Sequence, residues 1–336
     1  MDGVRSRQDR RRKMFRLAGF PAALSLLVCA GAVAAPLAAA AVPVVSATIH
    51  VGSDPQGVAV NSATGTVYVA NLDGTVSVIS GRAGTVTATI PVGSQPEGVA
   101  VNPKTGTVYV ANQFFTQYTG TVSVISPRTG TVATIHVGAD PQGVAVNPVT
   151  GTVYVANGGG PVSVISGKTG KVTATIRVGL TSIAVAVNPK TGAVYVAKGT
   201  GTVSVISGRT GKVTATIHVG ALPEGVAVNP KTGAVYVANA RSGAVSVISG
   251  KTNKVTATIR VGSNPVAVAI NPGTATVYVA NFLSSTVSVI SAKTDQLTAV
   301  IHVGSNPDGV AVNPSTGTVY VANSGSNTLS VISTSR

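Results

Sequence analysis

One short motif is repeated seven times along this chain of 336 residues. Each copy contains Val-Tyr-Val-Ala, and the seven tyrosines are Tyr68, Tyr109, Tyr154, Tyr195, Tyr236, Tyr278 and Tyr320. Successive copies are 41, 45, 41, 41, 42 and 42 residues apart. An internal period of about 40 residues is typical of radial or solenoid arrays, so the repeat limits the fold before any residue chemistry is considered. It says much less about function, because one repeat architecture carries many activities.

Four short runs rich in Val, Ile, Thr and Tyr make up each copy, and Gly, Asn, Pro or Asp residues bound each run. In the copy at 57–93 the runs are Gly-Val-Ala-Val-Asn (A), Thr-Val-Tyr-Val-Ala-Asn (B), Thr-Val-Ser-Val-Ile-Ser (C) and Val-Thr-Ala-Thr-Ile-Pro-Val (D). This composition predicts strands, and no run has the helical spacing of apolar residues. Turns such as Asn-Pro-Lys-Thr-Gly between A and B predict tight hairpins. Each copy is therefore expected to form a four-stranded antiparallel blade.

The two ends of the repeat array predict that the blades close into a ring. The last copy has runs A, B and C only, whereas the array begins with a lone run D at 45–51. Together the two fragments complete one blade. This gives an all-β, seven-bladed propeller of twenty-eight strands with no open sheet edge at the seam. A β-solenoid is the competing fold, but it gives no reason for the array to begin with the strand that the last copy lacks.

The Tyr-Val-Ala-Asn units, with an Asn-Pro-x-Thr-Gly turn before them, resemble the YVTN-type β-propeller repeats of bacterial and archaeal surface and periplasmic proteins. The resemblance covers residues 44–334, with Ala in place of Thr at the third motif position throughout. It implies a seven-bladed propeller that is often exported or held at the cell surface. It implies no single activity, because that family is functionally mixed.

Residues 1–41 have the composition of a bacterial export signal. Seven basic residues lie within 1–16, an Ala-rich apolar stretch follows, and Ala38, Ala39 and Ala40 offer a cleavage site. Arg11 and Arg12 are a relaxed match to a twin-arginine motif, so Sec and twin-arginine export both stay open. If it is not cleaved, the apolar stretch is long enough to span a bilayer. We expect cleavage, which leaves a propeller at 42–336 that is secreted or held at the cell surface, without a membrane span.

The single cysteine, Cys29, lies in this leader and follows Val28, a poor residue before a lipidated cysteine. The chain after the leader therefore has no disulfide and no thiol chemistry.

Charge is predicted to differ between the two faces of the ring. Residues after the leader include 17 basic and 7 acidic side chains. The A–B and C–D turns project from one face, which we call the basic face, and the B–C and D–A loops project from the other, the acidic face. The basic face has one acid, Asp295, and twelve cations: Arg82, Lys104, Arg128, Lys168, Lys171, Lys190, Arg209, Lys212, Lys231, Lys251, Lys254 and Lys293. The acidic face has Asp54, Asp73, Glu97, Asp140, Glu224 and Asp308, opposed by Lys198 and Arg241.

A ring of cations attracts a polyanion such as nucleic acid, an anionic wall polymer or anionic lipid. Solvated turn residues that were copied by duplication explain the same pattern without any ligand. Modules that bind nucleic acid usually add aromatic stacking platforms, and the basic face has none. We therefore expect at most a non-specific attraction to a polymer backbone.

Two departures from the repeat mark the acidic face. The second copy has a longer B–C loop with Phe114, Phe115 and Tyr118, and the sixth copy has Phe282 in the same loop. Exposed aromatic residues on loops are candidates for recognition, so these four are predicted to bind a partner; packing of the longer loop on its own blade is the alternative.

The residues just before run A form a second candidate group on the acidic face. Gln56, Glu97, Gln142, Glu224 and Asp308 would ring the mouth of the central channel and offer oxygen ligands to a cation. They are few and have no fixed acidic spacing, so we predict no metal site and no cofactor.

Other residues that suggest chemistry are interpreted as structural. His50, His136, His218 and His302 all lie in run D, the outermost strand, too far apart to share a metal. The seven tyrosines are interpreted as buried rings that pack blade against blade. The sequence has no Gly-x-Ser-x-Gly motif and no close pair of carboxylates. A site assembled from loops of several blades nevertheless leaves an enzyme open.

The predicted function is that of an exported, non-enzymatic, monomeric propeller that acts as a binding or scaffold module. Its acidic face would meet a protein, peptide or glycan at the cell envelope, and its basic face would lie toward an anionic polymer. The first alternative is an exported binder of nucleic acid or another anionic polymer. The second is a lactonase- or lyase-like propeller enzyme with a metal at the channel mouth.

Overall fold

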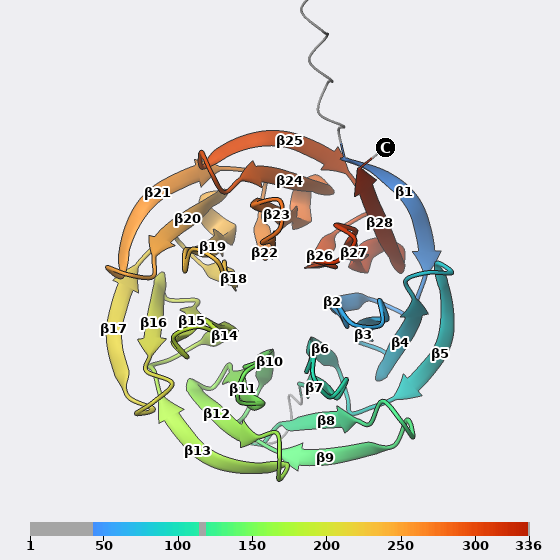
Figure 1. Cartoon of the computed structure of the whole chain (residues 1–336), viewed down its shortest axis with the longest axis horizontal. Helices are drawn as coiled ribbons and strands as arrows, with labels where there is room; N and C mark the ends of the chain where they lie inside the picture. Colours follow the sequence, from blue (N-terminus) through green and yellow to red (C-terminus); the bar gives the residue numbers. More distant parts are fainter. Residues whose placement is uncertain (1–42, 114–118, 335–336) are drawn as a thin grey trace, which may run out of the picture. The chain divides into compact units, whose positions relative to one another are not determined.

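The computed structural model describes residues 43–113 and 119–334, which belong to one compact unit, Ala41–Arg336. They form seven four-stranded antiparallel sheets that are arranged as blades around a ring (Figure 1). The predicted all-β, seven-bladed propeller is thereby confirmed. Within the described residues no helix is both long enough and apolar enough to cross a membrane. The export signal predicted at 1–41 lies outside them.

Each blade runs outward from the central channel through strands A, B, C and D. Blade 1 comprises β2 to β5, the blades are numbered along the chain, and blade 7 comprises β26, β27, β28 and β1. The A strands are β2 (Pro55–Val60), β6 (Pro96–Val101), β10 (Pro141–Val146), β14 (Ser182–Val187), β18 (Pro223–Val228), β22 (Pro265–Asn271) and β26 (Pro307–Val312). The B strands are β3 (Val67–Asn71), β7 (Val108–Asn112), β11 (Thr152–Asn157), β15 (Val194–Lys198), β19 (Val235–Asn239), β23 (Thr276–Asn281) and β27 (Val319–Asn323).

The C strands are β4 (Thr75–Ser80), β8 (Thr121–Ile125), β12 (Pro161–Ser166), β16 (Thr202–Ile206), β20 (Ala244–Ser249), β24 (Thr286–Ser291) and β28 (Thr328–Thr334). The outermost D strands are β5 (Thr85–Pro91), β9 (Val132–His136), β13 (Lys171–Arg177), β17 (Val213–His218), β21 (Lys254–Arg260), β25 (Gln296–His302) and β1 (Pro43–His50). Single-turn 3-10 helices follow the B strands of blades 5, 6 and 7: η1 (Ala240–Ser242), η2 (Phe282–Ser284) and η3 (Ser324–Ser326).

The seam of the ring is closed by the first strand, as the sequence predicts. Strand β1 pairs antiparallel with β28, with Val45 opposite Ile332 and Ile49 opposite Leu329. The Ser46 hydroxyl donates to the Val331 carbonyl at 3.2 Å. The first strand therefore supplies the D position of blade 7, where the rest of the sheet comes from the end of the chain.

The core lies between blades and repeats around the ring. The seven repeated tyrosines are at most 8% exposed, and each packs into a cluster with the next blade. Tyr320 of blade 7, for example, packs with Val58, Val67 and Val69 of blade 1. This confirms that the tyrosines pack blade against blade. Burial accordingly raises the pKa of each phenol, and Asp295 beside Tyr236 raises the pKa of that phenol further, to about 12.

A repeated Asn–Gly contact joins the Val-Gly linker to the following blade in every blade except blade 4, where Lys198 replaces the asparagine. The Asn71 amide, at the end of β3, donates to the hydroxyls of Thr75 and Ser77 at 3.1 Å. A Cβ atom on Gly52 would lie 2.6 Å from the Asn71 amide carbon, so only glycine fits against this side chain. The contact explains why the Val-Gly and Val-Ala-Asn motifs are copied together.

Candidate functional site

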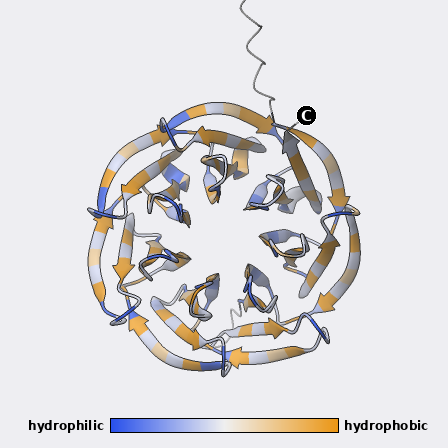
Figure 2. Ribbon diagram, viewed as in Figure 1, coloured by the Kyte–Doolittle hydropathy of each residue, from blue (hydrophilic) through white to orange (hydrophobic). Residues whose placement is uncertain are grey.

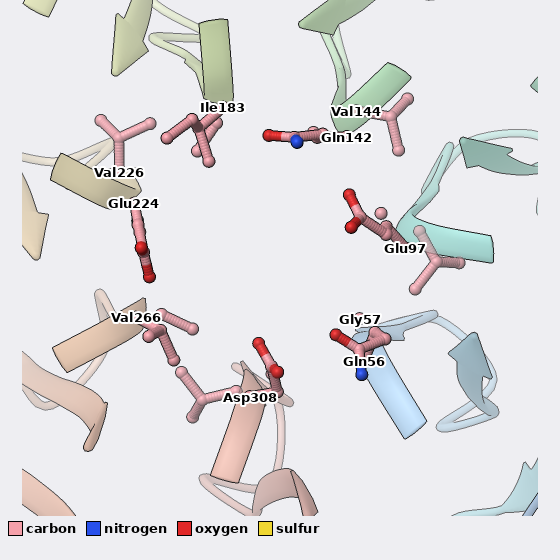
Figure 3. Close-up of a pocket in the computed structure, with 18 of the residues that line it drawn as sticks. Gln56, Gly57, Glu97, Gln142, Val144, Ile183, Glu224, Val226, Val266 and Asp308 are labelled. Carbon is pink, nitrogen blue, oxygen red and sulfur yellow. The ribbon is translucent and has the colours of Figure 1, made fainter. Parts of the chain in front are cut away.

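The mouth of the central channel is built from one strand position in each blade. The residues that follow the first residue of the seven A strands are Gln56, Glu97, Gln142, Ile183, Glu224, Val266 and Asp308. They line a cavity of about 430 Å³ (Figure 3). The carboxylates of Glu97, Glu224 and Asp308 point into the cavity, and the side chains of Ile183 and Val266 make part of its wall apolar. The five polar residues that the sequence predicts at the channel mouth are therefore brought together.

Glycine next to these residues allows the A strands to approach one another. A Cβ atom on Gly57 would lie 2.3 Å from the Glu97 carbonyl oxygen, and one on Gly98 would lie 2.2 Å from that of Gln142. Likewise, a Cβ atom on Gly309 would lie 2.2 Å from the Gln56 carbonyl oxygen. Glycine is thus required where the neighbouring A strand comes this close, whereas Ala184 and Ala267 occupy the equivalent positions in blades 4 and 6.

The D–A loops orient the two channel amides. Asp54 and Asp140 adopt positive φ angles of 51° and 57° and precede the prolines that begin β2 and β10. The Gln56 amide donates to the Asp54 carboxylate at 2.7 Å, and the Gln142 amide donates to Asp140 at 3.4 Å. Because each amide nitrogen is engaged by the loop, the amide oxygen is left to face the cavity (Figure 3).

The channel carboxyls hold their protons more strongly than ordinary acids. Burial raises the pKa of Glu97 to about 8, with further contributions from the charges of Asp140 and Asp308. Burial also raises the pKa of Asp308 to about 7, helped by Glu224 and Asp54. The pKa of Glu224 is raised by burial. At neutral pH the channel mouth is therefore less negative than its composition suggests, and it offers protonated carboxyls as hydrogen-bond donors.

The channel residues do not form a metal-binding group. Among residues 43–113 and 119–334, no cluster of three or more His, Cys, Asp or Glu side chains could hold a metal ion. The donor set thus does not fit the metal of the lactonase-like alternative, and we derive no chemistry through one. The four histidines are exposed on the outer strands β1, β9, β17 and β25, which belong to four different blades.

The basic face has the composition that the sequence predicts. The strand bounds place all twelve cations in A–B and C–D turns or at the first residue of a D strand, and all twelve are exposed. Figure 2 shows the hydrophilic turns along the rim of the ring. Two lysines reach from one blade to the next: Lys104 donates to the Val149 carbonyl and Lys190 to the Lys231 carbonyl, both at 3.1 Å. The binding role of these residues stays a prediction.

One of the two cations counted on the acidic face is buried. Lys198 is 8% exposed, and its ammonium donates to the Val178 carbonyl at 3.0 Å. Burial lowers the pKa of this lysine. It replaces the asparagine that ends the other B strands, and Gly179, which faces it, takes a φ of +106°. The sequence shows the replacement, but only the packing shows that this charge is withdrawn from the face.

The predicted aromatic site is described only in part. Phe114, Phe115 and Tyr118 lie outside the described residues. Phe282 begins η2 and is half-buried, beside Leu283, which is 68% exposed. A contact between these side chains and a protein, peptide or glycan stays a prediction.

Comparison with known proteins gives the fold and no more. No family model matches the sequence, and no curated protein matches it. Among solved structures, 1543 chains match, so the architecture is too common to point to one activity. One of them is the hydrazine synthase of Kuenenia stuttgartiensis, with a TM-score of 0.75 at 23% sequence identity. The match covers 84% of this chain and 96% of that chain.

Proposed function

We propose that this chain is a non-enzymatic binding propeller that acts outside the cytoplasm and attaches to an anionic polymer through its basic face. One observation carries the proposal: twelve exposed cations share a face with a single acid, Asp295. Charges of one sign on one surface steer a polyanion and gain affinity from the counterions that it releases. Export rests on the composition of residues 1–41, and the YVTN-type resemblance supports a place at the cell surface.

An enzymatic function is less well supported. Polar side chains of several blades converge in the channel, but in the part of the chain that the structure describes they form no cluster of three or more metal-ligating residues. The activity in the name of the hydrazine synthase belongs to that protein. A likeness at 23% identity extends to the fold alone.

The proposal predicts strong salt dependence. Retention of the purified protein on immobilised heparin should weaken steeply as salt rises, because binding rests on counterion release. Changing Lys168, Lys171, Arg209 and Lys212 to Gln together should lower the eluting salt concentration further. The proposed function would be contradicted if retention on heparin changed neither with the salt concentration nor with these four substitutions.

A further inference from the structure

The positive charge of the propeller is concentrated in one half of the ring. Blades 3, 4 and 5 span residues 138–260 and contain twelve Lys and Arg residues against two acids, Asp140 and Glu224. The described part of the other four blades contains four basic residues against five acids. The net charge is thus +10 on one side and −1 on the other, although the repeat itself has near-sevenfold symmetry. This half is coloured green to orange in Figure 1.

The basic face follows the same division. Eight of its twelve cations lie on blades 3 to 5, in a region that we call the basic arc, and blade 7 contributes none. Lys168, Arg209 and Lys251 occupy the C–D turns of three consecutive blades, toward the outer rim. Lys190 and Lys231 lie in A–B turns nearer the channel, and Lys190 bridges the two turns through its bond to the Lys231 carbonyl. The basic arc therefore has an outer and an inner row of cations.

This arrangement favours a linear polymer over a flat anionic surface. A membrane would press on the whole face, including the four blades that contribute only four of its twelve cations, whereas a flexible chain can follow three neighbouring blades and leave the others free. Nine of the twelve cations are lysines, which act as compact point charges and suit phosphate groups without fixing their orientation. In the described residues, the tyrosines beneath this face are buried and offer no platform on which a base could stack.

We propose that the basic arc of blades 3 to 5 binds a linear phosphodiester polymer that lacks bases, such as a polyol-phosphate chain of an envelope. The inference rests on the proposed function and deepens it, because it names the polymer chemistry and the part of the face that binds. The polymer backbone lies across the turns of the three blades, and the remaining blades stay open to solvent.

The chain provides a matched control for the test. The arc variant carries Lys168→Gln, Lys171→Gln, Arg209→Gln and Lys212→Gln, and the control carries Arg82→Gln, Lys104→Gln, Arg128→Gln and Lys293→Gln. Both remove four exposed cations from the same face, so the two proteins have the same net charge. Binding of poly(glycerol phosphate) is measured by fluorescence titration at several salt concentrations, with oligo(dT) of equal charge as the comparison polymer. Thermal melting checks that both variants are folded.

The arc variant should lose affinity for poly(glycerol phosphate) by tenfold or more beyond the control, an order-of-magnitude expectation from phosphate contacts. Its slope of log affinity against log salt should fall by about 0.7 for each contact removed, whereas the slope of the control stays near that of the parent protein. Equal losses of affinity in the two variants would show that the basic arc is not the binding region, and would leave the proposed function intact. Tighter binding of oligo(dT) than of poly(glycerol phosphate) would overturn the choice of polymer, and no binding of any polyanion would overturn the proposed function itself.

Discussion

Glu97 shows how the ring changes the chemistry of an ordinary side chain. Its position in the repeat is unremarkable, since glutamine, isoleucine or valine occupies the same place in other blades. Convergence of seven strands on one axis surrounds it with protein and brings the charges of Asp140 and Asp308 near. Sequence spacing predicts which residues reach the channel, but it does not report desolvation or the neighbouring charge from blades far away in sequence.

The coupling between channel acids can be measured directly. In an Asp308→Asn variant the pKa of Glu97 should fall from about 8, because one of the charges that raise it is removed. It should stay above the usual glutamate range, because burial is the larger cause. Carbon-detected NMR titration of the side-chain carboxyl provides the measurement, and Asp73→Asn is the control, since Asp73 is not among the charges that raise this pKa. An unchanged Glu97 pKa in the Asp308→Asn variant would show that the two carboxyls do not interact.

The raised pKa of Glu97 also makes the stability of the fold depend on pH. Because the pKa of Glu97 rises from 4.5 in the unfolded chain to about 8 in the folded protein, the folded state binds more protons between these values. Its contribution to the free energy of unfolding is therefore favourable below about pH 4.5 and is lost as pH rises toward 8. A Glu97→Gln variant should gain stability relative to the parent protein as pH increases across this window. Urea unfolding at pH 5 and pH 8.5 tests this, and parallel pH profiles would contradict it.

At the scale of the element, the seam strand β1 shows which features of the fold can be predicted from the sequence. The lone run D at the start of the array and the missing run D at its end were sufficient to predict ring closure, since period-two strands and turn chemistry repeat along the whole chain. The hairpin turns were equally predictable, because Asn61 accepts from the Ala63 amide as an Asx turn requires. The β-bulge between Val45 and Ala47 cannot be predicted from the sequence, because it depends on the pairing of β1 with β28.

Removal of residues 44–51 should lower the melting temperature markedly. The truncation takes away nearly all of β1 and exposes the edge of β28. Calorimetry of the truncated and parent proteins gives the comparison, and an unchanged melting temperature would show that the seam does not hold the ring.

A point substitution tests the seam without deleting it. Ile49 is 8% exposed and packs with Tyr320 and Leu329, so Ile49→Ala should cost about 2–5 kcal/mol of unfolding free energy. Thr48, the preceding residue on the same strand, is exposed, and Thr48→Ala should be nearly neutral. If the two variants are equally stable by urea unfolding, β1 contributes little to the core.

At the scale of the whole molecule, seven nearly identical blades make a scaffold whose asymmetry lies in its charges. The sequence predicts the two faces, because strand order alone assigns each turn to one side. The concentration of positive charge in blades 3 to 5 can also be counted in the sequence, because these blades are consecutive in the chain, whereas the sequence does not show how deeply each charge is buried. Lys198 is a particular case: it reads as a surface charge until packing shows that it is buried.

A circular permutant tests whether the seam position is interchangeable. Residues 334 and 43 pair across the seam, so a short glycine-rich linker should join them. New ends placed in the C–D turn of blade 3, between Lys168 and Thr169, recreate the same arrangement with β13 as the first strand. The permutant should melt close to the parent protein in calorimetry. Failure to fold would show that blade 7 has a special role as the seam.

The long reach of the seam also sets the order of events in folding. The hydroxyl of Ser46 and the carbonyl of Val331 are 285 residues apart in sequence, yet they meet in one sheet. Individual hairpins can form as soon as their strands are available, but the circle cannot be completed until the final strand has left the ribosome. Contacts of such high sequence separation form slowly, because the entropy of a very long loop must be overcome first. Until then the strands on the two sides of the seam lack their partners, and unpaired strand edges of this kind favour aggregation.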